Sequence, residues 1–197
     1  VSLTTKNVFL AIPFFVVSGA IMSAGGIANR LVGLAEALVG WMRGGMAVAA
    51  VLACVIFAAI SGSSPVTLIA IGGIMFPAML KAGYREPFAL GLITTAGSLG
   101  CLIPPSIPML VYAISVTGTS AVDVRELFMA GLGAATLIAL MLSVYAVLRA
   151  GPVSGERRFS FPALVEALKR GIWALMLPVL ILGGIYGGIF TATEAAT

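Results

Sequence analysis

Histidine is absent from this sequence, and charged residues are few. The 197 residues include no His, and Lys, Arg, Asp and Glu together make up 9%, against roughly 25% in soluble domains. Without His, the chain lacks the side chain that most often serves acid–base catalysis, catalytic triads and zinc sites. Apolar residues make up 60%, and the mean hydropathy is +1.15. This composition excludes most soluble enzymes and predicts a protein whose main solvent is lipid.

The sequence also lacks the motifs of disulfide, nucleotide and nucleic-acid chemistry. The two cysteines, Cys54 and Cys101, have neither CxxC spacing nor a disulfide framework, and we interpret them as small hydrophobic side chains. No GxxxxGK[ST] loop occurs, so nothing suggests that ATP drives the protein. The net charge of +4 comes from basic residues scattered at the ends of apolar runs, which indicates membrane topology and not a nucleic-acid partner.

Both ends of the sequence lie in apolar or unfinished segments. The chain starts without Met and runs directly into VSLTTKNVFLAIPFFV, and it stops just after a polar turn in GGIYGGIFTATEAAT. We therefore expect a fragment of a longer protein.

Apolar stretches of about 20 residues, the length that crosses a bilayer, alternate with shorter amphipathic ones. The segment 29–43 is too short and too amphipathic to cross, with Leu31, Leu34, Ala35 and Leu38 on one face, so we expect it to lie along the membrane interface. The fold class predicted is an all-α polytopic membrane protein. Its expected parts are a span at 7–28, an interfacial helix at 29–43, a helical hairpin at 44–81, a broken helix at 86–116, a span at 127–148, a loop and interfacial helix at 151–171, and a last span from 172.

Two long uncharged runs are each interrupted in the middle. Ser61-Gly62-Ser63-Ser64-Pro65 divides the first run into hairpin limbs near 45–60 and 65–80, each slightly short for a full crossing. The second run is broken at 97–108, where Pro104 and Pro105 cannot continue a regular helix. Each break alone is also explained without a site, since Ser64-Pro65 suits a helix start and prolines kink helices. Two breaks at membrane depth, however, are how many secondary transporters build a binding site.

The basic residues indicate how the chain is oriented. If the hairpin returns to its starting side, nine of the eleven basic residues fall on one face, which the positive-inside rule assigns to the cytoplasm. Only Lys6 and Arg125 lie opposite. This count leaves the depth of the hairpin open, because a re-entrant loop and a pair of full spans have the same parity. The nine residues are Arg30, Arg43, Lys81, Arg85, Arg149, Arg157, Arg158, Lys169 and Arg170.

The breaks offer two kinds of ligand. Carbonyls at the ends of the half-helices near Ser61 and Gly100 have no intrahelical partner and, with serine hydroxyls, suit Na⁺. N–H groups at the following helix starts suit a carboxylate substrate. The candidate substrate contacts are Ser64, Pro65, Thr67 and Ser106.

The spacing of SGSSP and GSLGCLIPPSIP, with the tail GGIYGGIFTATEAA, resembles the large membrane subunit of tripartite ATP-independent periplasmic (TRAP) transporters. The resemblance implies an elevator-type transporter with inverted repeats, the first at 1–150 and the start of the second at 172–197. It implies a sodium site at Ser61, Ser63, Gly100, Ile103 and Pro105. The implied partners are a small four-helix membrane subunit and a periplasmic binding protein, in the bacterial inner membrane.

The sequence thus predicts a subunit, not an enzyme, that imports small organic acids such as dicarboxylates or sialic acid with Na⁺. A channel remains the first alternative, because channels also use half-helix ends. An intramembrane hydrolase that uses one of the serines is the second, although the absence of His disfavours it.

Overall fold

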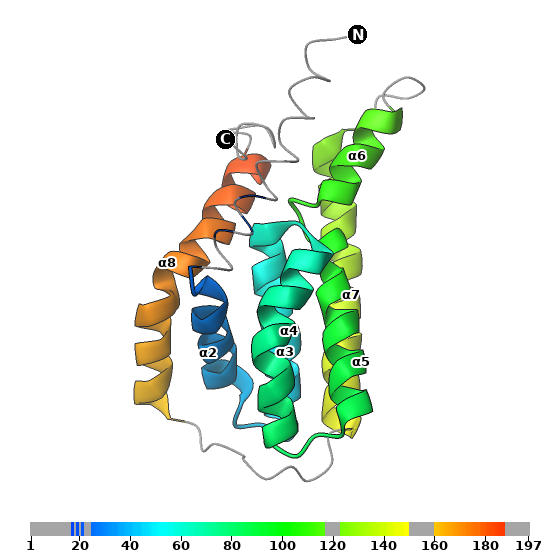
Figure 1. The fold of residues 1–197 in the computed structure, drawn as a ribbon. Coiled ribbons are helices and arrows are strands. Elements are labelled where there is room, and N and C mark those ends of the chain that lie inside the picture. Colours follow the sequence, from blue (N-terminus) through cyan, green and yellow to red (C-terminus); the bar gives the residue numbers. More distant parts are fainter. Residues whose placement is uncertain are drawn as a thin grey trace.

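The described part of the chain is a bundle of helices with no strand. The computed structural model describes residues 17, 19, 21, 25–116, 123–149 and 160–187. Within these ranges the helices run roughly alongside one another (Figure 1). They are α2 (Ile27–Val39), α3 (Gly45–Ser61), α4 (Ser64–Lys81), α5 (Glu86–Gly97), the 3₁₀-helix η1 (Ser98–Cys101), α6 (Ile107–Val116), α7 (Val124–Arg149) and α8 (Phe161–Tyr186).

Helix α3 is the centre of the bundle. Twelve of its residues are buried, half of them alanines, and it packs against α2, α4, α5, η1, α7 and α8. Small side chains allow neighbouring helices to approach closely, which is how helices associate in lipid, where little hydrophobic force drives them together. The outer helices are different, because α7 and α8 expose large apolar side chains such as Leu137, Met141 and Trp173. A surface of that kind requires lipid or protein around it.

The length and composition of the helices agree with the predicted membrane protein. Three helical segments are long and apolar enough to cross a bilayer, namely Ser64–Lys81, Val124–Arg149 and Leu164–Tyr186. Helix α3 is apolar but shorter, at 17 residues or about 26 Å. In Figure 1 the tip between α3 and α4 lies between the two ends of the bundle, below the upper ends of α6 and α8. The hairpin therefore turns inside the bundle.

Glycine, serine and proline set the boundaries that the sequence predicted. Helix α3 starts after Gly44, at φ 69°, and stops at Gly62, at φ 59°, both in the left-handed region that glycine favours. Helix α4 begins with Pro65 in its first turn, where the missing N–H costs nothing. Helices cover the two hairpin limbs, both halves of the broken helix and the stretch 127–148. Most of the span expected at 7–28 lies outside the described residues.

Helix α8 corrects the boundary expected near residue 171. We predicted an interfacial helix ending near Arg170 and a separate span from Ile172, but one continuous helix of 26 residues covers both. Nothing between these residues breaks a helix, since Gly171 packs against α2, with Leu34 Cδ2 3.8 Å from the position that a Cβ would occupy. The glycine serves close helix packing and not a helix end.

Helix α2 is amphipathic as predicted, but its apolar face does not lie on lipid. Leu31, Leu34 and Ala35 are fully buried against other helices, and α2 packs on α3 and α8, whereas Leu38, the fourth residue of the predicted face, is 40% exposed. It runs beside them in Figure 1 and not across the end of the bundle. The helix also ends at Val39, before a glycine-containing turn. Most of its apolar face is thus buried against protein.

Aromatic residues fix the turn between α4 and α5. Tyr84 stacks on Phe88 with ring centroids 5.8 Å apart, and Phe88 contacts Tyr145 of α7 at 5.9 Å. Burial raises the pKa of the Tyr84 hydroxyl, although a hydrogen bond with the backbone of Ala47 opposes the shift. The turn is therefore attached to both α3 and α7.

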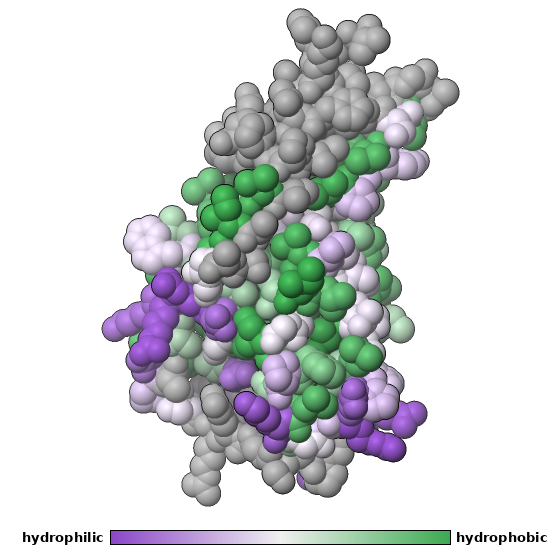
Figure 2. Space-filling model, in the orientation of Figure 1, coloured by the Kyte–Doolittle hydropathy of each residue, from purple (hydrophilic) through white to green (hydrophobic). Residues whose placement is uncertain are grey.

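Charged residues gather towards one end of the bundle. The end of α4, the start of α5, the end of α7 and the start of α8 all lie at the lower end in Figure 1. Figure 2 shows hydrophilic residues in the lower part of the visible face and apolar residues above them. Arg125 lies at the start of α7, at the opposite end, where its guanidinium donates to the Tyr186 carbonyl at the end of α8. The fold thus keeps the separation of charge on which the predicted topology rests.

We predict that residues 81–86 and 149–158 face the cytoplasm and that 117–125 face the periplasm. In the complete protein, with Cys54 and Cys101 replaced, a membrane-impermeant maleimide applied from the periplasmic side should modify Ser120→Cys but not Gly155→Cys. After the membrane is permeabilised, both positions should react. If only position 155 is labelled from the periplasmic side, the chain has the opposite orientation and the predicted topology is wrong.

Candidate functional site

The two helix breaks lie against each other, although more than 30 residues separate them in the chain. The Ile107 N–H donates to the Gly62 carbonyl at 3.1 Å, which joins the start of α6 to the hairpin tip. The Ser64 hydroxyl donates to the Ser98 carbonyl at 3.0 Å, and its oxygen is 2.9 Å from the Cys101 sulfur. The residues predicted for one site are therefore brought together from α3, α4, η1 and α6.

Two glycines make this close contact possible. A Cβ at Gly62 would collide with the Pro105 carbonyl oxygen, and the positive φ of Gly62 disfavours any other residue as well. A Cβ at Gly100 would lie 2.8 Å from the carbonyl carbon and oxygen of Ser63. Any side chain at either position would push the hairpin tip and the broken helix apart.

The carbonyls of Gly100, Ile103 and Pro105 are among those in the broken helix that have lost their usual helical donor. The Gly100 carbonyl would receive its bond from residue 104, but Pro104 has no N–H. The Ile103 carbonyl would receive it from Ile107, whose N–H goes to Gly62 instead. The Pro105 carbonyl would receive it from Met109, whose N–H points to the Ser106 hydroxyl at 3.4 Å. Unpaired carbonyls of this kind are strong ligands for a cation.

These are the three residues of the broken helix for which the family resemblance implied a sodium site. Cys101, next in the chain to Gly100, has the same difficulty because its helical donor would be Pro105. Its carbonyl is satisfied by the Ser106 hydroxyl instead. Pro104 and Pro105 therefore remove two successive N–H groups; within the described residues the Cys101 carbonyl finds a replacement donor, whereas the Gly100 carbonyl does not.

On the hairpin side, Thr67 orders the two predicted serine ligands. Its hydroxyl donates to the Ser63 carbonyl at 2.9 Å and lies 2.8 Å from the Ser61 hydroxyl oxygen. Since the Thr67 proton is used on Ser63, the Ser61 proton is free to point to the Thr67 oxygen or to the Ser63 carbonyl at 3.4 Å. The Ser61 oxygen accepts from the Ser63 N–H at 3.5 Å, which leaves it one further lone pair as an acceptor. Ser61 and Thr67 are both fully buried.

Ser63 offers its hydroxyl more readily than its carbonyl. The Ser63 carbonyl already accepts hydrogen bonds from both the N–H and the hydroxyl of Thr67. No hydrogen bond of the Ser63 hydroxyl is found within the described residues, and the side chain is only half-buried. The two serines can thus present hydroxyl oxygens towards the carbonyls of the broken helix.

The candidate substrate contacts are less accessible to a ligand than the sequence suggested. Thr67 and Ser106 are fully buried, and their hydroxyls donate to the carbonyls of Ser63 and Cys101. The Ser64 hydroxyl is held by Ser98, whereas Pro65 is exposed at the start of α4. Thr67 therefore belongs with the hairpin serines and not on a surface that an organic anion can reach. The i+4 spacing from Ser63 to Thr67, at which a threonine hydroxyl commonly bonds back to a helical carbonyl, is the signal that our sequence analysis missed.

The donor set consists of neutral oxygen atoms. Across the described ranges, no group of three or more His, Cys, Asp or Glu side chains is placed to hold a metal ion. Hydroxyl and carbonyl oxygens without a carboxylate suit a weakly held monovalent cation, whereas Ca²⁺ and Mg²⁺ usually recruit Asp or Glu.

Comparison with known proteins assigns the chain to a family. All 197 residues match the family described as "Tripartite ATP-independent periplasmic transporter, DctM component". The chain belongs to this family of membrane transport proteins. This confirms the resemblance, the all-α membrane fold and the prediction that the chain is not an enzyme.

Similar proteins carry names with different solutes. The chain is 50% identical to the C4-dicarboxylate TRAP transporter large permease protein DctM of Pseudomonas aeruginosa, over 95% of this chain and 43% of the relative. It is 42% identical to the ectoine permease TeaC of Halomonas elongata, with the same coverage. It is 44% identical to the isethionate permease DctMQ of Oleidesulfovibrio alaskensis, over 95% of this chain and 29% of the relative. The chain thus spans less than half the length of these relatives.

We predict that Gly62→Ala and Gly100→Ala lower the thermal stability of the complete protein, because both side chains would force the two breaks apart. For Gly62→Ala the left-handed backbone alone costs about 1–2 kcal/mol. Gly73→Ala is the matched control, since Gly73 lies in α4 with nothing within 4 Å of its added Cβ. Unfolding followed by size-exclusion chromatography after heating measures the effect. An unchanged melting temperature for both site variants would contradict the close contact.

Proposed function

We propose that this chain is part of the large membrane subunit of a sodium-coupled secondary transporter that imports small organic acids. One observation carries the proposal: three carbonyls without helical donors, at Gly100, Ile103 and Pro105, belong to a break that packs directly on the hairpin with Ser61 and Ser63. An ion bound between them would hold together two segments that otherwise share few hydrogen bonds.

Sodium fits this arrangement better than a permanently bound metal. A coupling ion must bind in one state of the transporter and leave in another, so its site has to be selective without being very tight. Backbone carbonyls and serine hydroxyls replace the hydration shell of the ion and add no full negative charge. A bound ion would provide a partner for the carbonyls that the prolines leave without a hydrogen-bond donor. Ion binding would therefore stabilise the unwound geometry of the break.

The family description supports the remaining parts of the proposal. The words "tripartite", "ATP-independent" and "periplasmic" are consistent with a small membrane subunit, a periplasmic binding protein and a drive other than ATP. We propose that the binding protein delivers the substrate to this subunit in the bacterial inner membrane. Because the relatives named for dicarboxylate, ectoine and isethionate are similarly close to the chain, the substrate belongs to the wider class of small polar solutes, with organic acids first.

A channel would use the same carbonyls differently. A channel would let the solute flow down its own gradient. Its flux would not saturate with substrate concentration, as the flux of a carrier that binds and releases each molecule does. Uptake of a labelled organic acid by the complete assembly should saturate with substrate and require an inward sodium gradient. Flux that persists unchanged after the gradient is collapsed would favour the channel.

We predict that Ser61→Ala and Ser63→Ala each raise the sodium concentration for half-maximal uptake by about five- to thirtyfold, as expected for a lost ligand of roughly 1–2 kcal/mol. The apparent substrate affinity at saturating sodium should change much less. The measurement is initial uptake against sodium concentration in proteoliposomes that contain the complete assembly.

Thr136→Ala is the matched control for these serine variants. The Thr136 hydroxyl also bonds a helical carbonyl, that of Leu132, but it is exposed in the middle of α7 and lies in neither break. Its sodium dependence should equal that of the parent protein. If both serine variants also keep the parental dependence, the serines only cap helices and the sodium site lies elsewhere.

A further inference from the structure

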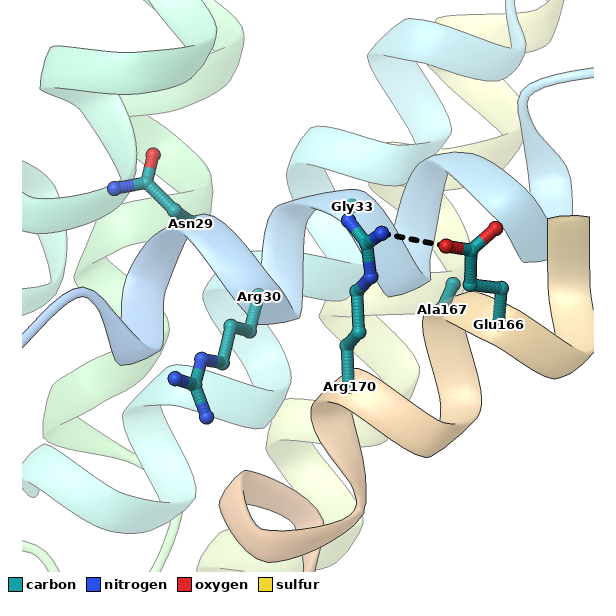
Figure 3. Close-up of a pocket in the computed structure, with 6 residues that line it drawn as sticks. All are labelled: Asn29, Arg30, Gly33, Glu166, Ala167 and Arg170. Carbon is teal, nitrogen blue, oxygen red and sulfur yellow. Dashed lines mark hydrogen bonds and ion pairs between the residues drawn. The ribbon is translucent and has the colours of Figure 1, made fainter.

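A charged pocket lies between α2 and α8, apart from the two helix breaks. Its volume is about 370 Å³, which is within the range of small-ligand sites. Small residues leave the space open, since a Cβ added at Gly33 would meet nothing within 4 Å, and Ala167 lies opposite on α8. The other lining residues are Asn29, Arg30, Glu166 and Arg170 (Figure 3).

The pocket carries one positive charge that no carboxylate in it neutralises. Arg170 reaches from α8 towards Gly33 and forms an ion pair with Glu166 at 2.5 Å. Arg30 extends from α2 in another direction and has no ion pair within the described residues (Figure 3). Two guanidinium groups and one carboxylate leave a net charge of +1; the Asn29 amide also lines the pocket but points away from both arginines in Figure 3. This donor set suits a phosphate group, which accepts bidentate bonds from arginine.

Helix α8 places the pocket at the depth of lipid headgroups. Its charged residues, Glu166, Lys169 and Arg170, all fall within its first ten positions. The stretch 171–187 has no charge and spans about 26 Å, close to the thickness of the hydrocarbon core. Trp173, which is 71% exposed, follows at the position where tryptophan commonly marks the interface.

An apolar surface continues from the pocket along α8. Trp173, Met176 and Leu180 are exposed and follow Arg170 at spacings of three, six and ten residues, so they share one side of the helix. A molecule with a phosphate at one end and hydrocarbon at the other would match both parts. Inorganic phosphate would use the charged part alone, and an ion pair as exposed as Arg170–Glu166 holds a free ion only weakly.

We propose that the α2–α8 pocket binds the phosphate of an anionic phospholipid headgroup in the leaflet at the basic end of the bundle, with the acyl chains along the exposed face of α8. The bound lipid would fill the gap between the two helices and connect α2 to α8 through Arg30 and Arg170. Nothing in this proposal depends on sodium coupling or on the transported solute.

The test measures lipid binding by the complete protein after removal of endogenous lipid. Phosphatidylglycerol and phosphatidylcholine with identical acyl chains are titrated, and retained lipid is counted by native mass spectrometry. The parent should retain phosphatidylglycerol preferentially. Arg30→Gln and Arg170→Gln should each weaken that binding about fivefold. Glu166→Gln should strengthen it by a similar factor, because it frees Arg170.

Two comparisons identify the source of the phosphate and the place of binding. Lys81→Gln with Arg85→Gln removes two charges from the same end of the bundle but away from the pocket, and should leave the preference unchanged. Inorganic phosphate at millimolar concentration should not displace the lipid. The proposal is overturned if the Lys81 and Arg85 control loses as much binding as the pocket variants, if inorganic phosphate competes fully, or if Glu166→Gln has no effect.

Discussion

The backbone N–H groups missing at Pro104 and Pro105 are the constraint on which the rest of the site depends. Without them the helix from α5 cannot continue, and the carbonyls of Gly100 and Cys101 lose their helical donors. The chain satisfies part of this loss with the Ser106 hydroxyl and moves the Ile107 N–H across to Gly62 on the hairpin. That transfer frees a further carbonyl, at Ile103, and also fixes the hairpin against the break. The two prolines thereby account both for the unpaired carbonyls that we propose as sodium ligands and for the contact that positions them.

The bundle supports this contact from outside. Helix α3 ends at the site and is buried along most of its length, and Phe57 and Ile60 near its end are fully or almost fully buried. Thr67 then bonds to Ser61 and Ser63 across the turn, so the two limbs of the hairpin are joined by side chains as well as by the chain itself. A site held by a rigid helix on one side and a threonine on the other needs no charged ligand to keep its shape. This suits an ion that has to leave.

Much of the fold could be predicted because its boundaries depend on local chemistry. Glycine at a positive φ, serine and proline at a helix start, and paired prolines at a break all act on the backbone around them. The limbs of the hairpin were therefore found within one residue of their predicted ends. The helix boundary expected near residue 171 was wrong because Lys169 and Arg170 resemble the end of an interfacial helix, although no residue there interrupts the backbone.

Other features of the site depend on the fold and could not be read from spacing alone. The contact of Ser64 with Cys101 joins residues 37 positions apart, and the burial of Ser106 follows from the packing of the broken helix against the hairpin. The assignment of Thr67 to the substrate was reasonable for a residue in the first turn of α4, but its hydroxyl turns inward. The sequence thus indicated which residues lie at the two breaks, whereas packing determines which way their side chains point.

The most direct test of this account is whether the hairpin tip and the broken helix touch at Ser64 and Cys101. In the complete protein with Cys54→Ala, Ser64→Cys places a second sulfur beside Cys101, where the oxygen of Ser64 lies 2.9 Å from the sulfur in the present structure. Mild oxidation should give a 64–101 disulfide, measured by mass spectrometry of peptides, whereas Thr95→Cys on the exposed side of α5 should give none. Free thiols at both 64 and 101, each still modified by a membrane-permeant maleimide, would contradict the contact and with it the site.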